Sequence, residues 1–152
     1  GGNLAAVIAL AFRDAGGPPL RLQVMLYPAT DFAMNTPSHS EFATGYMLTR
    51  ERMQYFAECY LRGARDAADW RASPLKATDF SRLPPAWIVT ASHDPLRDEG
   101  KAYADRLRAA GVVATYRCYD GMIHGFMTMS GAVDTALEAI NDTAASLKQA
   151  LK

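Results

Sequence analysis

The chain has 152 residues, of which 49% are hydrophobic and 21% are charged, which is the composition of an ordinary globular domain. Sixteen Lys and Arg residues balance sixteen Asp and Glu residues, and this zero net charge argues against a nucleic-acid or anionic-lipid partner. No apolar run reaches about eighteen residues, so the sequence predicts no membrane span.

A helix and a buried strand are the first two predicted elements. Residues 3–14 are rich in Ala and Leu and carry apolar side chains at helical spacing. The run Gly16-Gly17-Pro18-Pro19 should end this helix, because Pro and Gly disfavour its continuation. The apolar run over about 21–27, which ends at Pro28, predicts a strand buried on both faces.

A helical insertion is expected at about 38–70, because its apolar residues follow helical rather than alternating order. Thr49 before Arg50-Glu51-Arg52 suits the N-cap of one helix. Large apolar side chains of this segment either line a substrate pocket or pack the helices onto the sheet; they are Phe42, Tyr46, Met47, Met53, Tyr55 and Phe56.

The rest of the chain alternates strands with helices. Strands are predicted at about 86–91 and 113–119, and helices at about 95–110 and 131–151. This alternation predicts an α/β fold with a parallel sheet. Three parallel strands make a narrow sheet, so we expect one edge of the first strand to meet a strand outside this chain.

An acid and a histidine follow two of these strands. Asp94 comes just after strand 86–91, and His124, between Gly121 and Gly125, comes just after strand 113–119. Because chemistry in parallel sheets is built at the carboxyl edge, we expect Asp94 to orient His124 as a general base. The competing interpretation is that Asp94 only caps the helix that begins at Pro95.

The neighbouring polar residues receive structural interpretations. Asp98 is the less favoured candidate acid, and with Glu99 it suits the positive end of a helix dipole. His39 is expected to be a solvated loop residue, and His93 is expected to point away from Asp94.

No nucleophile or metal site is evident. None of the seven serines lies in a G-x-S-x-G turn, and Ser92 precedes the acid rather than leading the catalytic order. Cys59 and Cys118 lack metal-ligand spacing, and we expect two buried thiols in a reducing cytoplasm. The sequence therefore predicts no metal and no cofactor.

The C-terminal part resembles the hormone-sensitive-lipase family of α/β-hydrolases. The resemblance rests on the runs Asp94-Pro95-Leu96-Arg97-Asp98-Glu99-Gly100 and His124-Gly125-Phe126 and on the opening Gly1-Gly2-Asn3-Leu4-Ala5, which matches the end of the family's G-D-S-A-G-G-N-L-A elbow. It implies that 1–152 is the C-terminal half of one α/β-hydrolase domain, beginning just after the elbow serine. Its partners would be the N-terminal half of the domain, a small ester and possible second copies of the chain.

What the resemblance implies is a serine carboxylesterase for short- to medium-chain esters, with Asp94 as acid and His124 as base. Residues 38–70 would contribute to a cap over the substrate, and Phe126, Phe42 and Met47 are the candidate pocket residues. A lactone hydrolase, which uses the same chemistry, and a non-hydrolytic small-ligand receptor remain alternatives. His124 favours an enzyme over the receptor, because receptors of this fold replace the base.

Two further classes fit less well. Prolyl-oligopeptidase-type peptidases differ in the residues that follow the acid, and a nucleotide-binding module would need a glycine-rich loop after a strand. Gly1-Gly2 has no strand before it.

Overall fold

The computed structural model describes all residues, 1–152. Three parallel strands form one sheet in the order β1 (Gln23–Leu26), β2 (Ala86–His93) and β3 (Ala114–Ile123). The α/β class and the parallel sheet predicted from the sequence are confirmed. β1 lies within its predicted range, β2 begins at Ala86 as predicted but continues to His93, and β3 continues beyond 119 to Ile123.

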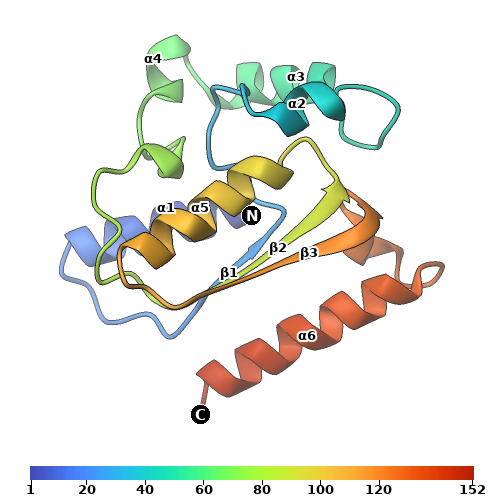
Figure 1. Cartoon of the computed structure of the whole chain (residues 1–152). Helices are drawn as coiled ribbons and strands as arrows, with labels where there is room; N and C mark the ends of the chain where they lie inside the picture. The colour runs from blue at the N-terminus through green and yellow to red at the C-terminus, as the bar shows by residue number, and fades with distance from the viewer.

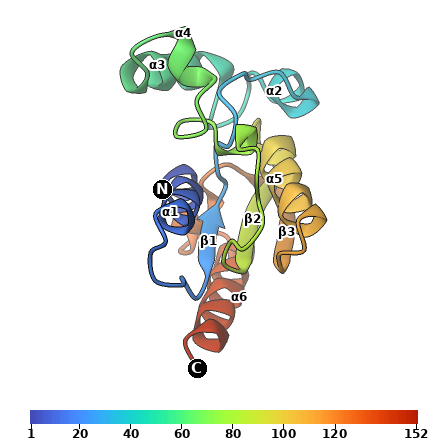
Figure 2. The ribbon, with the colours of Figure 1, turned by 90° about the vertical axis from the view of Figure 1, so that its left-hand side faces the viewer.

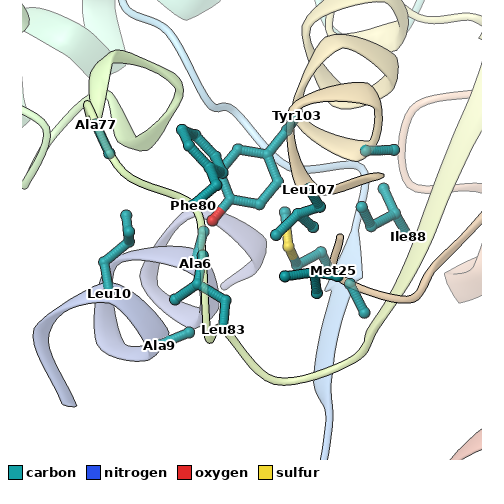
Figure 3. Packing of buried hydrophobic residues seen from close by; sticks show 13 residues of the cluster. Ala6, Ala9, Leu10, Met25, Ala77, Phe80, Leu83, Ile88, Tyr103 and Leu107 are labelled. Carbon is teal, nitrogen blue, oxygen red and sulfur yellow. The ribbon is translucent and has the colours of Figure 1, made fainter. Parts of the chain in front are cut away.

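Helices cover both faces of the sheet (Figures 1 and 2). On one face, α1 (Gly2–Asp14) and α5 (Arg97–Ala109) enclose an apolar cluster with Met25 and Ile88 from the strands (Figure 3). On the other face, α6 (Asp134–Ala150) packs with Phe126 and the β2 residue Val89. The two clusters follow from the alternation of side chains along each strand.

The connection between β1 and β2 carries the predicted helical insertion. It holds α2 (Pro37–Glu41), α3 (Arg50–Tyr60), α4 (Ala64–Ala67) and the 3-10 turn η1 (Pro74–Lys76). The Thr49 side chain accepts a hydrogen bond from the amide of Arg52, so the predicted cap of α3 is confirmed. Figure 1 shows α2 and α3 beyond the carboxyl ends of the strands.

An irregularity in β3 shapes the end of the sheet. Ala91 of β2 pairs with Tyr119, but His93 pairs with Ile123, so β3 carries extra residues between these pairs. Gly121 lies there with φ +69°, and its amide donates to the Ser92 hydroxyl at 2.9 Å. Extra residues of this kind bend a strand, and here they lie just before His124, which directly follows the end of β3. The short 3-10 helix η2 (Phe126–Met129) comes next.

Two predictions about burial are wrong. His39 is buried rather than solvated, with 1% of its surface exposed, because α2 is pressed against α5. Cys59 and Cys118 are both exposed free thiols rather than buried ones. Cys59 lies on the outer side of α3, and Cys118 lies on the poorly covered strand β3.

Candidate active site

Asp94 is held immediately after β2. It is fully buried, and its Oδ1 accepts a hydrogen bond from the amide of Leu96 at 2.9 Å. Its main-chain carbonyl accepts from the amide of Arg97, the first residue of α5. The N-cap of α5 is Leu96, so the prediction that Asp94 caps a helix beginning at Pro95 is wrong; Asp94 Oδ1 instead holds the turn before the helix, and Oδ2 is left for another partner.

That partner is His124. Its Nδ1 lies 2.8 Å from Asp94 Oδ2, and about a quarter of the imidazole remains exposed. Since a carboxylate accepts, Nδ1 carries the proton, and Nε2 is left with the lone pair that a general base needs. The two residues, thirty positions apart, meet at the carboxyl edge of the sheet.

Tyr27 lies against the imidazole. It follows β1, and its ring centroid is 4.9 Å from that of His124 with the planes tilted by 55°. Burial raises the pKa of the Tyr27 phenol above its ordinary value; the backbone amide of Met127 opposes this shift, and the charge of Asp94 adds to it. Sequence analysis missed this residue, although its place at the carboxyl end of a predicted strand was a usable signal.

An open cavity of about 960 Å³ adjoins the pair. His124, Tyr27 and the first residue of α1, Gly2, all border it. Most of its lining is apolar. Leu48, Met53, Phe56 and Tyr60 come from the insertion, Phe32 and Met34 come from the loop between β1 and α2, and Leu96 comes from the turn before α5. A largely apolar cavity with His124 at its margin suits a small organic molecule that carries one polar reacting group.

The three named pocket candidates lie outside that lining. Phe126 is 1% exposed and packs in the core against Tyr119, and Phe42 is buried against His93. Met47 is half exposed and lies beside Gly125. Phe126 belongs to a core cluster of the sheet and Phe42 packs against Tyr46 and His93, so both lie beside the cavity rather than in its lining.

The other polar candidates point elsewhere. Asp98 accepts from the Ser38 amide at 2.9 Å and pairs with Arg97, so it does not reach His124. His93 turns away from Asp94 and hydrogen-bonds Ser92, between the rings of Phe42 and Tyr46. No group of three or more His, Cys, Asp or Glu side chains is arranged to hold a metal ion.

Comparison with known proteins identifies relatives of the whole chain. A family model described as alpha/beta hydrolase fold matches residues 1–128. The carboxylesterase NlhH of Mycobacterium tuberculosis is 41% identical over 155 aligned residues, which cover 99% of this chain and 48% of the relative. The carboxylic ester hydrolase LipN of the same organism is 46% identical, over 85% of this chain and 36% of its own.

The crystal structure of EstE1, a thermostable carboxylesterase cloned from a metagenomic library, superposes with a TM-score of 0.96. It is 41% identical and covers 100% of this chain, which in turn covers 52% of EstE1. The chain thus spans about half the length of the relatives it matches.

Proposed function

Since the chain belongs to the hormone-sensitive-lipase family of α/β-hydrolases, we propose that the protein is a serine carboxylesterase in which Asp94 and His124 are the acid and the base. The observation that carries this proposal is the 2.8 Å contact between His124 Nδ1 and the buried Asp94 carboxylate beside an apolar cavity. Relatives named carboxylesterases support the same activity.

In the proposed reaction, a serine hydroxyl attacks the ester carbonyl and passes its proton to His124 Nε2. The tetrahedral intermediate collapses, the carbon–oxygen bond to the alcohol breaks, and His124 returns the proton to the departing alcohol. Water then attacks the acyl-enzyme by the same route and releases the carboxylic acid and the free serine. Asp94 holds the Nδ1–H tautomer and stabilises the imidazolium that forms in each half.

We propose that this serine precedes Gly1 in the full-length protein. None of the seven serines of the chain hydrogen-bonds His124, whose one side-chain partner is Asp94. Gly1 and Gly2, at the start of α1, border the same cavity as His124. Residues joined to that end of α1 would therefore enter the cavity within reach of the base.

The N-terminal half of the same domain is the proposed partner of this chain. The outer edge of β1 is unpaired, because β1 bonds only to β2. Leu4, Ile8 and Phe12 form an exposed stripe on α1, and each is more than 40% exposed. Further strands beside β1 would cover both, since an uncovered edge and an apolar stripe favour association.

The insertion at 38–70 is proposed to act as part of a substrate cap. Its residues Met53, Phe56 and Tyr60, all on α3, form one side of the cavity. A small ester with an apolar acyl or alcohol group of short to medium length is the proposed substrate, because the lining offers contact area but few polar partners.

Assembly and location are the last parts of the proposal. A homodimer is supported by the outer edge of β3, which also lacks a paired strand. A reducing cytoplasm is supported by two exposed free thiols, which an oxidising compartment would tend to convert to disulfides. None of the helices combines the length and apolar character that crossing a membrane requires.

The test is the hydrolysis of p-nitrophenyl acetate and p-nitrophenyl butyrate by the full-length protein and two variants. His124→Ala should lose almost all turnover, because His124 is the histidine at this cavity that the Asp94 carboxylate holds. His93→Ala is the matched control: its ring lies at the same strand end but turns away, so turnover should stay near the wild-type rate. An inactive wild type, or a His124→Ala variant as active as His93→Ala, would overturn the proposal.

A further inference from the structure

Tyr27 is bound into the site by its backbone in an unusual way. Its amide continues the β1 ladder by donating to Val89 at 2.7 Å, yet its φ is +37°, in a region that non-glycine residues rarely adopt. Pro28 follows directly and restricts the chain further. Strained residues of this kind persist where the surrounding structure holds them, and they are frequent at functional sites.

The strained backbone directs the phenol ring between two residues of the His124 loop. One neighbour is the imidazole, at 4.9 Å between centroids, and the other is Phe126, at 6.0 Å and 66°. Phe126 is fully buried in the cluster beneath the sheet. Tyr27 therefore connects the partly exposed His124 ring to a side chain that the core holds in place.

His124 needs such support, because its own loop supplies little. Gly121 and Gly125 bracket it, with φ of +69° and +80°. The Asp94 carboxylate fixes one nitrogen, and a single hydrogen bond still allows the ring to rotate about that contact. The Tyr27 ring, which lies against the imidazole at a tilt of 55°, limits this rotation on one side.

We infer that Tyr27 is a positioning residue, whose ring holds His124 in the orientation that keeps Nδ1 on Asp94 and Nε2 toward the cavity. The inference rests on the proposed function for its kinetic consequence, but not for the geometry itself. The ring rather than the hydroxyl carries the role, since the contacts of Tyr27 with His124 and Phe126 are made by its ring.

The test compares Tyr27→Phe with Tyr27→Leu in the full-length protein. Phe keeps the ring and loses only the hydroxyl, so kcat should remain within about threefold of the wild type. Leu removes the aromatic ring, so kcat should fall at least tenfold while KM for p-nitrophenyl acetate changes little. The lost orientation of His124 acts on proton transfer rather than on substrate binding. Equal kcat values in the two variants would overturn the inference.

A second readout does not depend on activity. An imidazole N–H bonded to a carboxylate gives a low-field proton resonance, which Asp94→Asn serves to assign by its loss. We expect this resonance to persist in Tyr27→Phe and to broaden or vanish in Tyr27→Leu through exchange with water. If it is unchanged in Tyr27→Leu, Tyr27 does not position His124, whether or not the protein proves to be an esterase.

Thermal unfolding of the same variants provides the control for folding. If Tyr27→Leu fails to fold, Tyr27→His keeps a planar ring at the same position and replaces it in both measurements. It should retain the resonance and part of the turnover. If a folded Tyr27→His variant lost both the resonance and the turnover, a planar ring at this position would not be what orients His124.

Discussion

Asp94 shows how one buried carboxylate serves the fold and the site together. Oδ1 accepts a hydrogen bond from the Leu96 amide, and Oδ2 accepts one from the His124 imidazole. One carboxylate oxygen thus holds the turn that leads into α5, and the other holds the imidazole. The turn before α5 therefore orients the carboxylate that orients His124.

Gly100 is the residue that brings α5 close to the sheet. A Cβ built on it would lie 2.8 Å from Thr90 Cγ2 on β2, closer than real contacts allow. Gly100→Ala should therefore destabilise the full-length protein by about 1–3 kcal/mol through overpacking. The gain of roughly 1 kcal/mol in helix propensity that the same change gives at an unhindered site offsets part of this cost, so a net loss of up to about 2 kcal/mol is expected.

Chemical denaturation would measure the change in the free energy of unfolding, provided that its dependence on denaturant concentration is the same in both proteins. The control is Lys101→Ala on the exposed side of the same helix, where a change within about 0.5 kcal/mol is expected. A Gly100→Ala variant as stable as the wild type would show that α5 can shift from β2 without cost.

At the scale of elements, a buried His–Glu pair joins the insertion to the α/β layers. His39 on α2 lies 3.1 Å from Glu99 on α5, and both are almost completely buried. Glu99 also accepts from the amide of Thr30 after β1. Burial raises the pKa of Glu99, and His39 and the amides of Thr30 and Asp31 only partly offset this effect.

The raised pKa has a predictable consequence for stability. A carboxyl group whose pKa is higher in the folded state binds protons more readily there. The free energy of unfolding should therefore rise as pH falls from the raised pKa of Glu99 toward its ordinary value of 4.5. Glu99→Gln cannot titrate. The stability of the wild type relative to Glu99→Gln should therefore rise as pH is lowered through that interval.

Chemical denaturation of both proteins across this pH range tests the pair. Glu58→Gln, the same change at an exposed position of α3, should track the wild type at every pH. A stability difference between wild type and Glu99→Gln that is independent of pH, or that shrinks as pH falls, would contradict a raised pKa.

Elements set by local pattern were predictable, and those set by packing were not. Apolar runs and Pro or Gly stops indicated β1, β2, α1 and α5, because these signals act within a few residues. His39 was misplaced, because its burial depends on Glu99, sixty positions away. The sequence also predicts Phe126 and Phe42 as pocket residues, because an aromatic residue of the core and one that lines a cavity look alike in sequence. Only packing between distant segments separates the two.

At the scale of the whole molecule, the parallel sheet, the bulge in β3 and the insertion converge on one edge. β2 delivers Asp94, the extra residues of β3 deliver His124, and β1 delivers Tyr27, all at the carboxyl ends of the strands. Figure 2 shows α2 and α3 of the insertion beyond this edge, and residues of the insertion line the cavity there. Spacing along the chain predicted the meeting of Asp94 and His124, because parallel strands end at a common edge.

The most direct test of the account is a double-mutant cycle in the full-length protein, with Asp94→Asn, His124→Ala and the combined variant assayed for kcat/KM on p-nitrophenyl acetate. If the carboxylate acts only through the imidazole, Asp94→Asn alone should cost on the order of 10⁴-fold and should cost almost nothing further once His124 is alanine. Independent losses that multiply in the combined variant would contradict the claim that Asp94 and His124 work as one unit.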